Sequence, residues 1–294
     1  MKIISSLFFL LMLLTSSQIS AAEPDSMLHR IISLSPSVTE VLFELGLGDK
    51  VVGVTRYCDY PEQAETITKV GGYFDPNYEV ILSLKPDLVI LLDEHEQARN
   101  NFSSFGIEVL AVNHKTISGI VESLTLIGDK CGAALEAKQV LSGIQARLTR
   151  VKTSVQGLAT PKIVISIGRS WGTQSIGQLH LVGLDGFFSE IITCAGGRNA
   201  YVGDIPFPEV SKEGLLSLDP DMIIDLVPDM EKRGFKADQL LADWNSFAML
   251  RAVKEQKVTI FGEGFMVIPG PRFISIIEAM AKVLHPEIDQ GGKP

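Results

Sequence analysis

The chain has 294 residues, which is long enough for two α/β lobes. It is 46% apolar and 21% charged, a composition typical of globular proteins. Its net charge of -9 argues against nucleic-acid binding, which requires a basic surface. An anionic small ligand is not excluded, because a few local cations would suffice to bind it.

Residues 1–22 are predicted to form a signal peptide. Lys2 precedes an apolar run from Leu7 to Leu14, and Ser20-Ala21-Ala22 matches a small-residue cleavage site. The run is too short to span a bilayer as a stable helix, and a retained membrane anchor is the alternative interpretation. No cysteine follows the run, so lipid attachment is not expected. We expect an exported, soluble, periplasmic protein after cleavage near Ala22.

Strands and helices alternate through residues 23–132, which are predicted to form an N-terminal lobe. The expected strands are Ile31–Leu34, Val51–Val54, Leu88–Leu92 and Glu108–Val112. Ser35-Pro36-Ser37 opens a helix, in which Ser37 and Glu40 have the spacing of a capping box. This alternation predicts parallel β-α-β units.

A long helix is predicted next, followed by a second lobe. Residues 133–157 contain apolar side chains at helical spacing and would span ~35 Å, enough to connect two lobes. Residues 158–294 are predicted to form the C-terminal lobe. Its expected strands are Ile163–Ile167, Met222–Leu226 and Val258–Phe261, and its expected helices are Gly186–Cys194 and Ile274–Leu284.

A twelve-residue pattern occurs once in each predicted lobe. Glu79-Val-Ile-Leu-Ser-Leu-Lys-Pro-Asp-Leu-Val-Ile90 returns as Glu213-Gly-Leu-Leu-Ser-Leu-Asp-Pro-Asp-Met-Ile-Ile224. Each copy predicts a short helix, a Pro-Asp turn and a buried strand. The expected fold class is therefore α/β: two Rossmann-like lobes with mainly parallel sheets, one long linker helix and a ligand cleft between the lobes.

The repeats and three further segments carry a resemblance to a known family. The segments are Arg30-Ile-Ile-Ser-Leu-Ser-Pro-Ser-Val-Thr-Glu40, Tyr57-Cys-Asp-Tyr-Pro61 and Ile205-Pro-Phe-Pro-Glu-Val-Ser211. Over nearly the whole mature chain, the sequence resembles periplasmic solute-binding proteins of ABC importers, in the class with one rigid helical linker. That class binds cobalamin, ferric siderophores or haem, and the second and third segments look most like the cobalamin binders.

The resemblance implies a role for the first glutamate of each repeat. In the family, one glutamate on each lobe docks onto arginines of the inner-membrane permease, and Glu79 and Glu213 occupy the matching positions. Complementary charge of this kind fixes orientation and raises the association rate. The alternative is that each carboxylate only stabilises the start of its helix.

The resemblance also implies ligand-binding residues. Tyr57, Tyr73 with Phe74 beside it, Trp171 and Phe207 match or lie near family positions that contact the ligand, and flat aromatic rings suit a large macrocycle. The alternative for each ring is a place in the core or on the surface.

Several positions depart from the cobalamin-binding pattern. Tyr73 and Phe207 replace tryptophans, and Leu92 replaces an aromatic residue. Gly264 stands where an acidic residue is expected, with Glu263 beside it as the candidate. A tyrosine next to Gly72 is also similar to the haem binders, in which such a tyrosine coordinates iron.

Other candidate chemistry is weak. Cys58, Cys131 and Cys194 have no metal-ligand spacing, and an odd count leaves at least one unpaired, with one disulfide still open. Asp93-Glu94-His95-Glu96 is either a solvated loop or a metal-binding cluster. Arg169, Arg198 and Arg272 are either surface charges or contacts to acidic groups of a ligand. No metal site is expected.

No catalytic motif stands out, so an enzyme is not expected. We expect a monomeric binding protein without an intrinsic cofactor that captures a corrinoid, with cobalamin as the expected ligand, and delivers it to the permease. The first alternative is a haem or ferric-siderophore binder of the same class. The alternatives of other classes are an exported α/β enzyme with an unrecognised site and an exported structural protein.

Overall fold

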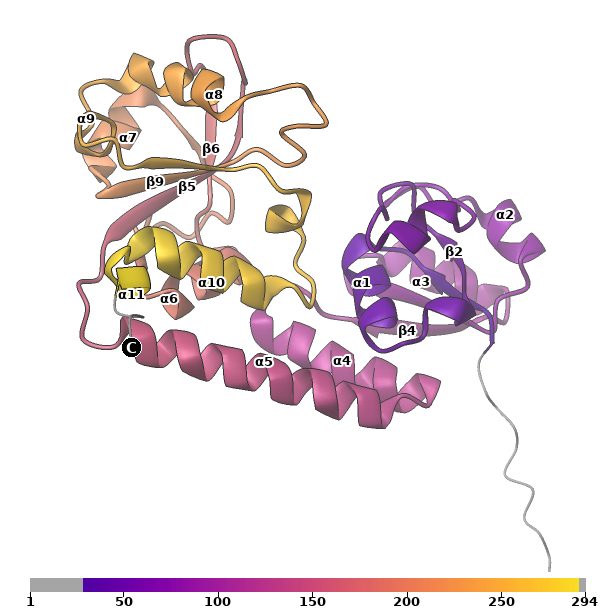
Figure 1. The fold of residues 1–294 in the computed structure, drawn as a ribbon. Helices are drawn as coiled ribbons and strands as arrows, with labels where there is room; N and C mark the ends of the chain where they lie inside the picture. Colours follow the sequence, from indigo (N-terminus) through magenta and orange to yellow (C-terminus); the bar gives the residue numbers. More distant parts are fainter. Residues whose placement is uncertain (1–28, 291–294) are drawn as a thin grey trace, which may run out of the picture.

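The computed structural model describes residues 29–290, in which two α/β lobes are joined by a long helix (Figure 1). The expected signal peptide lies outside the described residues. The N-terminal lobe contains a four-stranded parallel sheet with the strand order β2-β1-β3-β4. Its elements are β1 (Ile31–Ser33), α1 (Pro36–Glu44), η1 (Gly48–Lys50), β2 (Val51–Val54), η2 (Glu62–Thr66), α2 (Tyr78–Ser83), β3 (Leu88–Leu92), α3 (Glu96–Ser104) and β4 (Glu108–Val112).

The C-terminal lobe contains a six-stranded mixed sheet, in which β10, β9 and β5 are parallel and β6 is antiparallel to β5 and β8. Its strands are β5 (Lys162–Arg169), β6 (Leu179–Leu181), β7 (Arg198–Asn199), β8 (Glu209–Val210), β9 (Met222–Leu226) and β10 (Val258–Phe261). Its helices are α6 (Phe187–Cys194), α7 (Lys212–Leu218), α8 (Ala237–Asp243), η3 (Trp244–Phe247), α9 (Arg251–Lys254), η4 (Gly264–Val267), α10 (Phe273–Leu284) and α11 (Glu287–Gln290). The expected α/β fold with two lobes and mainly parallel sheets is confirmed.

Two helices form the connection between the lobes. Helix α4 (Ile117–Cys131) ends at Gly132, whose φ of 75° suits a glycine, and α5 (Ala134–Val155) follows directly. Helix α5 has 22 residues and packs against α4, α6 and α10. Helix α4 has no counterpart among the expected elements, although Thr116 caps it by accepting the N–H of Gly119 at 3.0 Å.

The repeated sequence pattern folds into the same unit twice, α2–β3 and α7–β9. Asn77 caps α2 by accepting the N–H of Val80, and Ser211 caps α7 by accepting the N–H of Gly214, both at 3.1 Å. These caps leave Glu79 and Glu213 in the first turns of their helices, where the helix dipole favours a carboxylate.

The Pro-Asp turn also makes the same hydrogen bond in both units. The Asp87 carboxylate accepts the N–H of Arg30 at 3.0 Å, and the Asp221 carboxylate accepts the N–H of Lys162 at 2.7 Å. Each aspartate therefore ties the last strand of its repeat to the beginning of the central strand of its lobe, β1 or β5.

The expected capping box at Ser37 and Glu40 is wrong. Ser35 is the N-cap residue of α1 and makes no side-chain cap, and Pro36 takes the first helical position. Ser37 instead contacts His114, with 2.8 Å between Oγ and Nδ1, and Glu40 pairs with Arg272 of the other lobe. Tertiary partners have replaced the local capping interaction.

The largest buried apolar cluster passes through both lobes. It runs from α1 and the inner face of the N-terminal sheet through α4 and α5 to α6 and α10. Two smaller clusters cover the outer faces of the two sheets. The lobes therefore share one core along the connecting helices, which limits their relative motion. Within residues 29–290, no helix is long and apolar enough to cross a membrane.

Candidate ligand cleft

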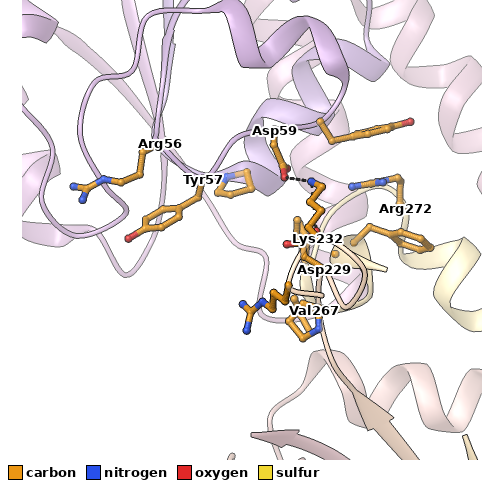
Figure 2. A pocket seen from close by; sticks show the side chains of 14 residues that line it. Arg56, Tyr57, Asp59, Asp229, Lys232, Val267 and Arg272 are labelled. Carbon is orange, nitrogen blue, oxygen red and sulfur yellow. Dashed lines mark hydrogen bonds and ion pairs between the residues drawn. The ribbon is translucent and has the colours of Figure 1, made fainter. Parts of the chain in front are cut away.

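A hollow of ≈ 520 Å³ lies between the lobes and is the main candidate site (Figure 2). The N-terminal lobe lines it with Pro36 after β1 and with Arg56, Tyr57, Asp59 and Tyr60 after β2. The C-terminal lobe lines it from two loops, with Pro228, Asp229, Lys232 and Arg233 after β9 and with Gly264, Phe265, Val267, Ile268 and Arg272 after β10. Loops at the carboxyl ends of parallel strands are the usual ligand position in α/β sheets.

A second hollow of ≈ 310 Å³ continues the cleft. It shares Pro36, Tyr57, Val267 and Ile268 with the first and extends to Tyr73 and Leu92. We call the two hollows together the interlobe cleft. Its N-terminal wall carries three tyrosines, Tyr57, Tyr60 and Tyr73, among polar, charged and apolar residues, and its C-terminal wall combines apolar side chains with charges.

The floor of the cleft is fixed by an ion pair between the lobes. Arg272, at the start of α10, donates two hydrogen bonds to the Glu40 carboxylate, at 2.9 and 2.6 Å. Its guanidinium also lies 3.7 Å from the Tyr60 ring centroid. Burial raises the pKa of Glu40, and the contact with Arg272 partly offsets that effect. The Arg272 guanidinium therefore partly compensates for the burial of the Glu40 carboxylate.

A second ion pair crosses the cleft in a more exposed position. Lys232 of the C-terminal lobe donates to Asp59 of the N-terminal lobe at 3.2 Å and lies 3.5 Å from Asp229 (Figure 2). The Lys232 side chain is 67% exposed, and exposed pairs contribute little stability. A ligand could therefore displace this contact at low cost.

The aromatic candidates of the N-terminal lobe occupy three different environments. Tyr57 lines both parts of the cleft, and Tyr73 lines the part next to Leu92. Phe74 is 76% exposed and lines a separate hollow of ≈ 320 Å³ on the N-terminal lobe. The structure thus brings Tyr57 and Tyr73 together at the cleft wall, with Phe74 on the far side of Tyr73.

The candidates of the C-terminal lobe lie farther from the cleft. Trp171 is half-buried and packs against Phe235 and under the Arg233 guanidinium, which lies 4.8 Å from the ring centroid. Arg233 lines the cleft, so the Arg233 side chain lies between the Trp171 ring and the cleft. Phe207, on the loop before β8, is 48% exposed, and Glu263 is exposed beside η4. Neither is among the residues that line the two hollows.

The acidic-histidine segment after β3 is partly buried against Tyr73. His95 is buried and accepts the N–H of Leu92 through Nδ1 at 3.3 Å, while burial lowers its pKa. Tyr73 donates its hydroxyl to Glu94 at 2.7 Å. Burial and this carboxylate raise the pKa of Tyr73. Within residues 29–290, no cluster of three or more His, Cys, Asp or Glu side chains could hold a metal ion.

The three arginines singled out from the sequence have different surroundings. Arg272 lines the cleft. Arg169 is completely buried in ion pairs with Asp225 and Asp243, each at 2.7 Å, and Arg198 is exposed on β7. The three cysteines are all unpaired, with Cys58 and Cys131 buried.

Several cleft residues were not expected from the sequence. They include Arg56, Asp59, Tyr60, Asp229, Lys232, Arg233, Phe265, Val267 and Ile268. What these residues share is their place in the sequence, because each lies in a loop that follows the carboxyl end of a parallel strand. That rule would have drawn attention to the loops after β2, β9 and β10.

Glu79 and Glu213 are exposed, each at the second position of its helix. Helices α2 and α7 lie on the outer sides of their lobes, away from α5 (Figure 1). Both carboxylates are therefore exposed to solvent, on helices that lie away from α5.

Two lobes that share a linker helix and enclose an open cleft are the architecture of bilobed ligand-binding proteins, and also of many enzymes. A family model described as periplasmic binding protein matches residues 31–263, most of the chain. The chain belongs to the periplasmic binding protein family, which is a family of binding proteins and not of enzymes.

Relatives of known name support this assignment. The chain is 30% identical over 230 residues to a vitamin B12-binding protein of Vibrio campbellii, covering 74% of this chain and 76% of that one. It is 28% identical over 266 residues to an uncharacterized ABC transporter substrate-binding lipoprotein of Bacillus subtilis, covering 88% and 80%.

Solved structures show the same fold. The periplasmic vitamin B12-binding protein of Vibrio cholerae matches with a TM-score of 0.74 and 25% identity, over 90% of this chain and 98% of that one. A periplasmic haem-binding protein of Roseiflexus sp. RS-1 matches with a TM-score of 0.75 and 22% identity, over 89% and 99%. Proteins named for different ligands thus share this fold, so the fold does not identify the ligand.

Proposed function

We propose that this protein is the substrate-binding component of an ABC importer, and that it captures a corrinoid, cobalamin, in the interlobe cleft and delivers it to a membrane permease. The observation that carries the proposal is the cleft itself, an open hollow with Tyr57 and Tyr73 on one wall. Aromatic faces bury much of a macrocycle at low conformational cost. The B12-binding relatives support the choice of a corrinoid.

Haem or a ferric siderophore is the second candidate ligand. The observation in its favour is the charge of the cleft wall, where Arg56, Lys232, Arg233 and Arg272 face Asp59 and Asp229. Arginines form bidentate hydrogen bonds with carboxylates, so such a wall suits ligands with several carboxylates. Iron ligation by Tyr73 is less favoured, because its hydroxyl already donates a hydrogen bond to Glu94 at 2.7 Å that ligation would have to break.

Ligand titration tests this choice. Isothermal titration of the mature protein with cyanocobalamin, haem and a ferric hydroxamate should give tight binding for cyanocobalamin. Replacing Tyr57 by alanine should weaken that binding by roughly 1–3 kcal/mol, the range for aromatic contacts at binding sites. Phe105→Ala removes a ring of similar exposure outside the cleft and should have no effect. Tight haem binding without cobalamin binding would replace the corrinoid proposal by the second candidate.

Delivery is proposed to depend on Glu79 and Glu213. Changing both to alanine should leave cobalamin affinity unchanged and reduce uptake in vesicles that contain the permease, because each carboxylate offers a counter-charge to a cation of the partner. The defect should vary with ionic strength, since the contacts would be partly solvated. Glu136→Ala, which removes an exposed first-turn glutamate from α5, is the matched control. Normal uptake by the double variant would refute the docking role.

A further inference from the structure

One cation of the interlobe cleft differs from the others in having no carboxylate partner. Arg272 pairs with Glu40, Lys232 pairs with Asp59, and Arg56 pairs with Asp75. Arg233 also lines the cleft, yet no carboxylate of residues 29–290 lies within ion-pair distance of its side chain. A guanidinium that faces a cleft without a counter-charge is available to an anion.

The Arg233 guanidinium is held in place by an aromatic ring. It lies 4.8 Å from the centroid of the Trp171 indole, a cation–π distance, and Phe235 packs against the edge of the same indole. Stacking reduces the rotamer freedom that a free arginine would lose on binding, so a ligand meets a partly preorganised donor.

The loop that carries Trp171 is fixed in turn by buried charges. Asp243 accepts the N–H groups of Gly172 and Gln174 at 2.8 and 2.7 Å, and its carboxylate pairs with the buried Arg169. These hydrogen bonds anchor the backbone directly after the indole to the interior of the lobe.

We propose that Arg233, positioned by Trp171, forms a subsite for an oxyanion of the bound ligand, either a phosphodiester or a carboxylate. This subsite rests on the proposed function, because it assumes a ligand in the interlobe cleft. Arg233 donates hydrogen bonds to the anion, and Lys232, the next residue, adds positive charge once its weak contact with Asp59 is displaced. Ligands of the same class that lack this oxyanion bind more weakly.

Pairs of ligands with and without the anion test the subsite. Cobinamide lacks the nucleotide loop of cobalamin and with it the phosphodiester, and haem dimethyl ester lacks the carboxylates of haem. Arg233→Gln should weaken binding of the member that carries the oxyanion roughly ten- to hundred-fold, as expected for a hydrogen bond to a charged group, and leave the member without it within about twofold. The difference should shrink with added salt. Arg198→Gln removes an exposed arginine of the same lobe and is the matched control.

A spectroscopic readout tests the positioning role of Trp171. The chain has two tryptophans, so its ¹H-¹⁵N spectrum shows two indole signals, and Trp171→Phe identifies one of them. That signal should shift on addition of cobalamin or of millimolar pyrophosphate, but not on addition of haem dimethyl ester. In Arg233→Gln, neither cobalamin nor pyrophosphate should shift it. Trp171→Leu should lower affinity for the anionic ligand roughly three- to tenfold.

The outcomes separate the two proposals. If the protein binds neither pair of macrocycles, the proposed function is refuted. If pyrophosphate still shifts the Trp171 signal through Arg233 in that case, the subsite is retained. Equal losses of affinity for the ligands with and without the oxyanion in Arg233→Gln would overturn the subsite. So would a pyrophosphate-induced shift that persists in that variant.

Discussion

Removing Arg272 should destabilise the protein by leaving Glu40 buried without its counter-charge. The Glu40 side chain is 2% exposed and the Arg272 side chain is 23% exposed. Breaking a buried pair from one side costs about 3–5 kcal/mol. A ceiling applies here, because Glu40 can take up a proton. Protonating a carboxyl of ordinary pKa 4.5 at pH 7 costs about 3.4 kcal/mol, so we expect a loss of about 3 kcal/mol for Arg272→Met.

The double-mutant cycle separates this pair from general packing. Glu40→Gln should cost only about 1 kcal/mol, because Arg272 keeps partial access to water and its contact with the Tyr60 ring. The double variant should cost less than the sum of the two singles by at least about 1.5 kcal/mol. The measurement is urea unfolding followed by circular dichroism.

The pH dependence gives the sharpest check. Without Arg272 the folded-state pKa of Glu40 lies further above its unfolded value, so stability rises as the pH falls through that folded pKa. The deficit of Arg272→Met should therefore shrink to about 1 kcal/mol at pH 5. A deficit below 0.5 kcal/mol at pH 7, judged against the ~3 kcal/mol expected for an uncompensated buried charge, would refute the reasoning. So would a deficit that does not change with pH.

Two further predictions concern buried polar groups. His114 lies between the hydroxyls of Ser37 and Ser123, and burial lowers its pKa to about 4. The folded state should therefore lose about 2–4 kcal/mol of stability as the pH falls from 6.5 to 4. His114→Gln should remove this loss in acid unfolding curves. Asp243→Asn should cost about 3–5 kcal/mol in urea unfolding, because Arg169 keeps only one carboxylate partner, and a cost near zero would show that Asp225 alone satisfies it.

The fold was predictable where local signals and burial agree. The two repeats are an example, because each combines a capping residue, a Pro-Asp turn and a continuous apolar strand, and the strands Leu88–Leu92 and Met222–Leu226 were predicted to the residue. The capping box failed because Glu40 found a partner 232 positions away in sequence, which no local pattern contains. Helix α4 was missed although it has a capping threonine and a terminal glycine.

The candidate site was harder to predict, because it is assembled from loops of two lobes. A motif placed Tyr57 in the right segment, and the structure puts that ring at the cleft wall; its contact with a ligand stays a prediction. Trp171 was expected in the cleft, but whether an indole meets a ligand directly depends on the side chain above it, here Arg233. Such layering is decided by tertiary packing, so sequence spacing carries no trace of it.

The shared core along α4 and α5 has a consequence for the efficiency of uptake. With the lobes fixed to one another by this core and by Glu40 and Arg272, the spacing of Glu79 and Glu213 changes little when the cleft fills. Under the proposed function, an empty protein then presents almost the same docking face as a loaded one and competes with it for the permease. Uptake at a fixed amount of ligand should pass through a maximum as binding protein is added, and decline once empty molecules are in excess.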